Sequence, residues 1–156
     1  MMQLVLWRHA EAEDYAASDL ARPLTPKGRK QAQKMAAWLK GQADVGAKDW
    51  RIIASPAVRT QQTAEALGVP FETVPGIAPD VSAGAVLDAA HWPQGNANVV
   101  VVGHQPTLGM VAAQLMNGAD GYVSIKKGAM WWFEMREKEG KRVSALKAMA
   151  SPDMVG

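Results

Sequence analysis

The chain has 156 residues and no cysteine, which suits one domain over residues 1–156 and excludes disulfides, thiolate catalysis and cysteine-ligated metals. The formal net charge is only +2, so composition gives little support for nucleic-acid binding, and we expect none. No apolar run approaches the roughly 20 residues of a membrane helix. The lack of cysteine also favours a reducing compartment. We therefore expect a cytoplasmic protein that binds no membrane.

The first part of the chain alternates between a strand and a helix. Residues 4–7 form a short apolar run, typical of a buried strand, and residues 11–22 are polar, as in a loop. Thr25 and Pro26 have the pattern of a helix N-cap followed by proline in the first turn, and Gly41 is a plausible stop. Four apolar residues of this helix fall at helical spacing: Ala32, Met35, Ala36 and Leu39.

The middle of the chain repeats this alternation. Residues 51–54 predict a second strand, and Ser55-Pro56 repeats the cap-plus-proline pattern of a helix that ends near Gly68. Residues 71–74 predict a short third strand, and residues 81–91 a helix. The β-branched run at 98–102 predicts a fourth strand, which is followed by a helix from Pro106 to about Met116.

The end of the chain has a different pattern. Residues 130–136 and 143–149 are apolar-rich segments joined by Glu139-Gly140-Lys141, which predicts an antiparallel hairpin, and we expect residues 149–156 to be a loosely ordered tail. Strands that alternate with helices indicate an α/β fold. We therefore predict a three-layer sandwich with a mainly parallel central sheet and a C-terminal antiparallel hairpin.

Polar or basic residues follow three of the predicted strands. Arg8-His9 follows the first strand, residues 55–59 follow the second, and Gly103-His104 follows the fourth. Ligands of open parallel sheets bind beyond the carboxyl ends of the strands. We therefore expect three segments that are distant in sequence to meet in one crevice.

The chemistry of this crevice suits a dianion. Arg8 and Arg59 supply guanidinium groups that match phosphate oxygens, and the helices expected at Pro56 and Pro106 would add free backbone N–H groups. The chain has three histidines and neither an HxH nor an HExxH spacing, so we expect no metal and no cofactor. The other basic residues are spread along the chain, and we interpret them as solvated surface charges: Lys27, Arg29, Lys30, Lys34, Lys126 and Lys127.

A neutral imidazole can attack phosphorus and form a phosphohistidine that water later hydrolyses. His9 stands at a strand end, where the sheet would hold it rigidly for in-line attack. His104 would then bind the phosphoryl group as a second ligand. Taken singly, His9 could be a structural histidine and Arg59 a surface charge. It is the occurrence of all three segments at corresponding strand ends that favours the catalytic interpretation.

Four segments, in this order, resemble the motifs of the histidine phosphatase superfamily. Residues 6–12 are similar to its Arg-His-Gly signature, with Ala10 where glycine is usual, and residues 102–106 are similar to the segment with the second histidine. Residues 24–32 resemble Leu-Thr-x-x-Gly-x-x-Gln-Ala, and residues 55–64 resemble Ser-x-x-x-Arg-x-x-Gln-Thr-Ala. The resemblance implies a phosphoglycerate mutase-like fold. The short chain and residues 16–25 resemble the SixA-like phosphohistidine phosphatase branch.

Carried over by position, the resemblance implies that His9 is the nucleophile and that Arg8, Arg59 and His104 bind phosphate. Arg22 and Asp19 match residues near the pocket, where Arg22 would also bind phosphate. The proton donor of the mutase-like members has no clear match in this sequence. Three carboxylates are candidates for the general acid: Asp19, Asp80 and Glu11.

These features predict a metal-independent phosphatase that works through a phosphohistidine intermediate. A phosphohistidine-bearing protein domain is the favoured substrate, because imidazole leaves easily once it is protonated and demands little of a general acid. A small phosphorylated metabolite, hydrolysed by a phosphomonoesterase of the same superfamily, is the alternative. A phosphate-binding interaction module without catalysis is the alternative of a different class.

Overall fold

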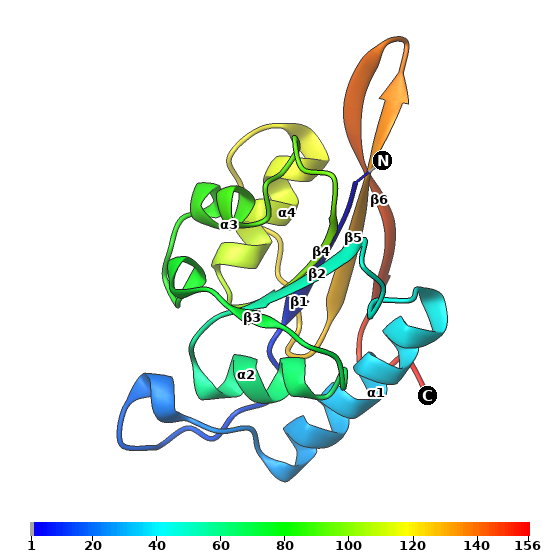
Figure 1. Cartoon of the computed structure of the whole chain (residues 1–156). Helices are drawn as coiled ribbons and strands as arrows, with labels where there is room; N and C mark the ends of the chain where they lie inside the picture. Colours follow the sequence, from blue (N-terminus) through cyan, green and yellow to red (C-terminus); the bar gives the residue numbers. More distant parts are fainter. Residues whose placement is uncertain (1) are drawn as a thin grey trace.

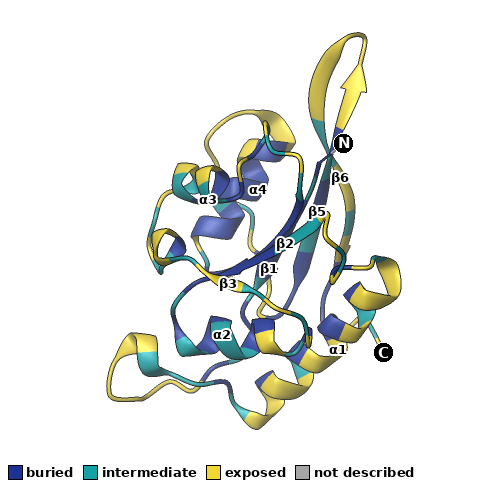
Figure 2. Ribbon diagram, viewed as in Figure 1, coloured by how far each residue is buried: buried dark blue, intermediate teal, exposed yellow. Residues whose placement is uncertain are grey.

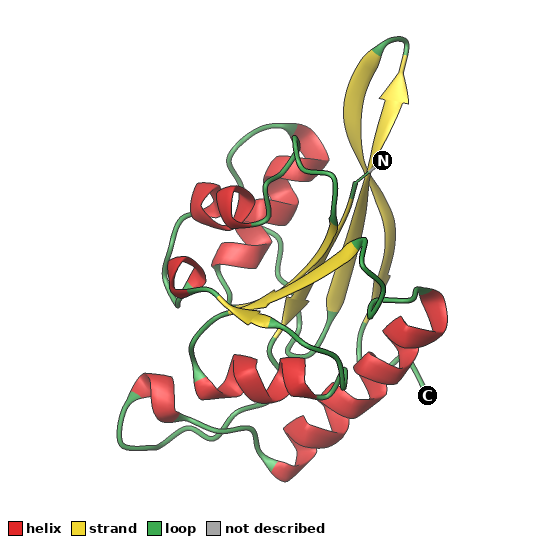
Figure 3. Cartoon of the chain, in the orientation of Figure 1, coloured by secondary structure: helices red, strands yellow, loops and turns green. Residues whose placement is uncertain are grey.

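The computed structural model describes residues 2–156 as a six-stranded sheet with helices on both faces (Figure 1 and Figure 3). Its elements, in chain order, are β1 (Gln3–Arg8), η1 (Asp19–Ala21), α1 (Pro26–Gln42), β2 (Trp50–Ala54), α2 (Val58–Glu65), β3 (Glu72–Thr73), η2 (Pro75–Ile77), α3 (Ala83–Ala89), β4 (Asn98–Gly103), α4 (Thr107–Asn117), β5 (Met130–Lys138) and β6 (Lys141–Ala150). None of the helices in residues 2–156 is long and apolar enough to cross a membrane.

The strand order is β3-β2-β4-β1-β5-β6. The first four strands in this order pair in parallel, and β5 is antiparallel to both of its neighbours. The predicted α/β sandwich with a mainly parallel sheet and a C-terminal hairpin is therefore confirmed. Figure 1 shows the tip of the hairpin extending beyond the body of the molecule, and Figure 2 shows that this tip is exposed.

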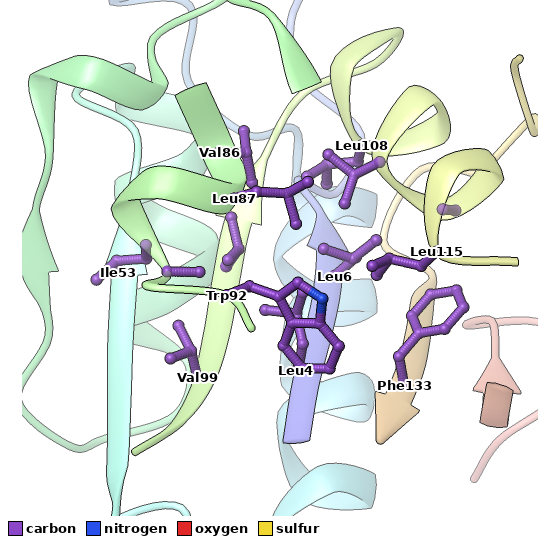
Figure 4. Close-up of a cluster of buried hydrophobic side chains, with 14 of the residues drawn as sticks. Leu4, Leu6, Ile53, Val86, Leu87, Trp92, Val99, Leu108, Leu115 and Phe133 are labelled. Atoms are coloured by element: carbon purple, nitrogen blue, oxygen red, sulfur yellow. The ribbon is translucent and has the colours of Figure 1, made fainter. Parts of the chain in front are cut away.

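Alternation along the strands builds a core on each face of the sheet. Leu4 and Leu6 of β1 pack in the cluster that contains α3 and α4, whereas Val5 and Trp7 pack in the cluster that contains α1 and α2. Figure 4 shows the first cluster, with Leu108 and other helical side chains set against those of the strands. Each fully buried side chain of this kind stabilises the fold by about 1.5–3 kcal/mol relative to exposure.

β4 and β1 are the two central strands of the sheet. All six residues of β4 are buried, because β2 and β1 flank its edges and helices cover both faces (Figure 2). This explains why its sequence is a continuous β-branched run rather than an alternating one. Residues directly after β1 and β4 therefore leave a rigid, buried part of the sheet.

The predicted start of the first helix is confirmed. The Thr25 hydroxyl accepts a hydrogen bond from the Gly28 N–H at 2.9 Å, and Pro26 begins α1. The same prediction at Ser55-Pro56 is wrong, since α2 begins at Val58 and has no side-chain cap. The Ser55 hydroxyl accepts from the Ala57 N–H just before the helix and also contacts His104, a tertiary contact that a sequence pattern does not reveal.

The structure differs from prediction at two other places, one helix and the C-terminal tail. The helix predicted over 81–91 is shorter, running from Ala83 to Ala89, and its start is fixed by the Ser82 hydroxyl, which accepts from the Ala85 N–H at 3.1 Å. The tail predicted to be loosely ordered packs against the body, with Pro152 buried and its carbonyl bound to Lys34 Nζ at 3.0 Å.

Candidate active site

The carboxyl ends of β1, β2 and β4 bring the three predicted segments together. The His9 N–H donates to the Gly103 carbonyl at 3.1 Å, and the Ser55 N–H donates to the Val102 carbonyl at 3.1 Å. Each segment thus continues the hydrogen bonding of the sheet for one residue past its strand. The rings of His9 and His104 lie with their centroids 5.5 Å apart, although 95 positions separate them in sequence.

The local contacts of His9 determine its tautomer. Its Nδ1 lies 2.7 Å from the Ala10 carbonyl oxygen. A carbonyl can only accept a hydrogen bond, so Nδ1 carries the proton in the neutral ring. Nε2 is left with a lone pair, and His9 has the form of a nucleophile. The ring is largely buried, with 7% of the residue exposed.

Ser55 positions the second histidine. Its hydroxyl oxygen lies 2.7 Å from His104 Nε2 and accepts from the Ala57 N–H at 3.3 Å. A hydroxyl can donate and accept at once, so it can also donate its proton to His104 Nε2, and the ring proton of His104 is then on Nδ1. His104 can therefore donate one hydrogen bond to an anion while remaining neutral.

Backbone carbonyls and one carboxylate hold the two arginines. Arg8 donates from Nη1 to the Ile125 carbonyl at 2.8 Å. Arg59 donates from Nη1 to the Asp19 carbonyl at 2.8 Å and from Nη2 to the Asp19 carboxylate at 3.1 Å. Within residues 2–156, the buried side-chain polar atoms without a hydrogen-bond partner all belong to this site: Arg8 Nε, Arg59 Nε and His104 Nδ1.

These side chains line a cavity of about 300 Å³, which we call the histidine cavity. It is lined by Arg8, His9, Ala12, Asp14, Asp19, Arg22, Arg59, Pro79, Asp80, His104, Gln105 and Lys127. An unsatisfied buried donor costs about 1–3 kcal/mol, so a cluster of such donors favours an anionic ligand. The cavity suits a phosphoryl group, as the sequence chemistry predicts.

Burial keeps both histidines neutral. Desolvation, with further repulsion from His104 and the arginines, lowers the pKa of His9 to about 3. Desolvation and the positive charge of Arg59 lower the pKa of His104 to about 4, although the Asp19 carboxylate opposes this. At neutral pH the lone pair on His9 Nε2 is therefore available without removal of a proton.

The three candidate acids occupy different surroundings. Asp19 and Asp80 line the histidine cavity, whereas Glu11 faces a neighbouring groove and accepts from the Thr25 hydroxyl at 2.8 Å. Partial burial would raise the pKa of Asp19, but hydrogen bonds and charges from Arg59 and Arg22 hold it below its ordinary value. Asp19 is therefore ionised at neutral pH and acts as a counterion.

Several residues of the recognised motifs support the site without lining it. The Thr63 hydroxyl accepts from the Ala10 N–H at 3.2 Å, Gln62 accepts from the Leu24 N–H at 2.7 Å, and Gln31 accepts from the Glu11 N–H at 2.9 Å. Ala10, where glycine is usual, is fully buried and does not have a positive φ, so alanine fits there without strain. Gln31, Gln62 and Thr63 lie in segments that resemble family motifs, but only the fold shows that they hold the loop after β1.

The amino end of α4 offers fewer free backbone N–H groups than predicted. In α4 the Leu108 N–H binds the His104 carbonyl, and the Gly109 N–H binds the Gln105 side chain at 2.7 Å. These two groups are not free to bind an anion. In the described part of the chain, no group of three or more His, Cys, Asp or Glu is placed to hold a metal ion.

Comparisons with known proteins agree with this site. A model of the histidine phosphatase superfamily (branch 1) matches residues 4–80. The phosphohistidine phosphatase SixA of Escherichia coli (strain K12) is 37% identical over 125 residues, covering 75% of this chain and 76% of that protein. The Haemophilus influenzae protein named phosphohistidine phosphatase SixA homolog is 32% identical, with 97% of each chain covered.

The solved structure of the protein histidine phosphatase SixA complexed with tungstate has a TM-score of 0.81 to this chain. The two are 32% identical, and the match covers 97% of this chain and 98% of that one. Sequence, fold and the order of the motifs thus lead to the same group of enzymes. The chain belongs to the histidine phosphatase superfamily, in its SixA-like branch, and is a phosphatase.

Proposed function

We propose that the enzyme removes the phosphoryl group from a phosphohistidine carried on a partner protein. The observation that carries the chemistry is the make-up of the histidine cavity: His9 has its lone pair on Nε2, and Arg8, Arg59 and His104, which line the same cavity, each have a buried nitrogen without a protein partner. The preference for phosphohistidine is supported by the relatives named phosphohistidine phosphatase and by the undemanding leaving group.

The reaction has two steps. His9 Nε2 attacks phosphorus, the P–N bond to the substrate imidazole breaks, and its electron pair stays with that imidazole, which takes up a proton. Water then attacks phosphorus, the bond to His9 breaks, and inorganic phosphate leaves. Arg8, Arg59 and His104 bind the equatorial oxygens and stabilise their charge in both transition states.

We propose Asp80 as the group that protonates the leaving imidazole. Asp80 lines the histidine cavity, and no carboxylate–cation pair within 4.0 Å involves it in the described chain, whereas Asp19 is paired with two arginines. Its φ of 67° is in the left-handed region, an unusual conformation that asparagine and aspartate tolerate best and that recurs at functional sites. The same carboxylate would accept a proton from water in the second step.

Replacement of His9 by asparagine tests the chemistry. We expect H9N to lose at least about 10³-fold in kcat on a phosphohistidine protein and on 4-nitrophenyl phosphate, because the nucleophile is gone. His91 is an exposed histidine remote from the cavity and has a φ of 56°, which asparagine accepts, so H91N is the matched control and should keep wild-type rates.

Two further results separate the alternatives. Label from a ³²P substrate, quenched without acid, should appear on the wild-type protein and not on H9N. A small phosphomonoester with a higher kcat/KM than the phosphohistidine protein would favour a metabolite phosphatase. Near-wild-type turnover by H9N would exclude the mechanism altogether.

A further inference from the structure

A second, larger cavity of about 740 Å³ adjoins the histidine cavity, and we call it the lysine groove. Arg8 and Lys127 line both cavities. The remaining cations of the groove are Lys27, Lys30, Lys34 and Lys126. These residues come from two distant segments of the sequence. They are exposed, as predicted, but the fold also collects them beside the site.

Three elements build the groove. α1 presents Lys27, Lys30 and Lys34 at positions i, i+3 and i+7, which places them on one face of the helix. The segment 124–127 and the packed C-terminal residues Pro152 and Asp153 form the rest of the lining. A hydrogen bond joins α1 to the C-terminal residues, since Lys34 Nζ donates to the Pro152 carbonyl at 3.0 Å.

The charge of the groove is largely uncompensated. Six cations and two carboxylates line it, a surplus of four positive charges, while the whole chain carries +2. Asp153 lies 3.6 Å from Lys126, and Glu11 accepts from the Thr25 hydroxyl. In residues 2–156, no carboxylate lies within 4.0 Å of the amino groups of Lys27, Lys30 or Lys127. These exposed lysines are available to an external anion.

We propose that the lysine groove docks the acidic surface of the partner protein that carries the phosphohistidine. This proposal rests on the proposed function and adds the chemistry of the partner. Lys27 to Lys34 span about 10 Å along α1 at 1.5 Å per residue, so the groove extends beyond the reach of a small molecule seated in the 300 Å³ histidine cavity.

The lining favours carboxylates over nucleic acid as the source of negative charge. No aromatic residue lines the groove, so it lacks the platforms on which bases stack. Flexible lysines suit the dispersed carboxylates of a protein surface and increase the rate of encounter through long-range attraction. The shared residues Arg8 and Lys127 make the positive surface continuous with the catalytic cavity.

The test uses two synthetic peptides of equal length with a central phosphohistidine, one flanked by glutamates and one by glutamines. At low salt we expect the wild-type enzyme to show about tenfold higher kcat/KM for the acidic peptide, and we expect this preference to vanish at 0.5 M NaCl. The double variant K27E/K30E should lose the preference but retain wild-type turnover of the glutamine peptide and of 4-nitrophenyl phosphate.

A matched variant controls for net charge. R29E/K48E changes the charge by the same amount at exposed residues outside the groove, and it should keep the preference. Equal kcat/KM for the two peptides in wild type, or equal loss in both double variants, would overturn the proposal.

Binding of the unphosphorylated peptides, measured by fluorescence anisotropy, tests the groove apart from the chemistry. Selective binding of the acidic peptide that K27E/K30E abolishes supports docking even if the enzyme fails to hydrolyse phosphohistidine. Binding of a single-stranded oligonucleotide as tight as that of the acidic peptide, and equally sensitive to K27E/K30E, would assign the groove to nucleic acid and overturn the proposal.

Discussion

The histidine cavity and the lysine groove share Arg8 and Lys127, yet they hold positive charge in different ways. In the cavity, Arg59 is 4% exposed and is anchored to a carbonyl and a carboxylate of Asp19. In the groove, Lys27 and Lys30 are exposed side chains on a helix. Buried, anchored cations meet the transition state without reorganisation, while exposed ones attract a partner from a distance. One continuous basic surface can therefore use its buried cations for catalysis and its exposed cations for recognition.

The strongest way to break this comparison is to remove the buried cation. We expect R59A to lower kcat/KM about 10²–10³-fold for every substrate, because the phosphoryl oxygens lose an anchored donor. R59K should recover only part of this loss, since an ammonium cannot reproduce the guanidinium fork. The exposed R29A is the control. A tenfold or smaller effect of R59A would show that the cavity does not depend on its buried charge.

The buried histidines should give the cavity an acid-sensitive contribution to stability. Their pKa values are about 3 and about 4 in the folded chain, and ordinary histidine titrates near 6.5 when unfolded. Below pH 6.5 the unfolded chain therefore binds more protons, so this stability is complete above pH 6.5 and is lost progressively as the pH falls.

Urea unfolding at pH 7.5 and pH 5 measures this effect. We expect the free energy of unfolding of the wild type to fall between these pH values, and the fall to be smaller in the double variant H9N/H104N. The variant K27E/K30E leaves both histidines in place, so it should keep the wild-type dependence of stability on pH. Equal slopes in wild type and H9N/H104N would contradict neutral, buried histidines.

A substitution at Gly28 tests the contact between α1, which lines the lysine groove, and the loop after β1, which borders the histidine cavity. A Cβ atom at this position would lie 2.0 Å from the Glu11 carbonyl oxygen, so α1 can pack against the loop after β1 only through glycine. We expect G28A to lower the free energy of unfolding by about 1–3 kcal/mol, as overpacking does. Gly41 is on the same helix with open space around it, and G41A should be neutral or stabilising.

The smallest effect is expected at Ser55, which positions His104 without touching the substrate. S55A removes the hydrogen bond to His104 Nε2, and we expect kcat to fall about threefold to tenfold with little change in KM. S55T retains a hydroxyl and should restore part of the rate. Unchanged kcat in S55A would show that the ring of His104 is held by packing alone.

Much of the fold could be predicted from the sequence because its signals are local. The β-branched run of β4, the Thr25-Pro26 cap and the Glu139-Gly140 turn each determine structure within a few residues. The prediction at Ser55-Pro56 was wrong because α2 begins only at Val58: the Ser55 hydroxyl accepts from the Ala57 N–H, ahead of the helix, and also binds a histidine 49 positions away. Competing tertiary partners of this kind leave no local pattern.

The candidate site divides in the same way. His9, His104 and Arg59 were identified because each follows a strand, and parallel strands end at one edge of a sheet. The general acid could not be chosen from sequence. Asp19, Asp80 and Glu11 are equivalent carboxylates until the fold pairs the first with arginines and turns the last toward another groove.

By itself, the sequence of this protein determined which segments become strands and helices, and which reactive side chains stand at the strand ends, since both depend on neighbouring residues. Only the tertiary structure decided which nitrogen of His9 holds the proton, how far burial lowers the histidine pKa values, and that two distant lysine segments form one groove. These properties depend on distance and exclusion of water, and both arise only when remote parts of the chain pack together.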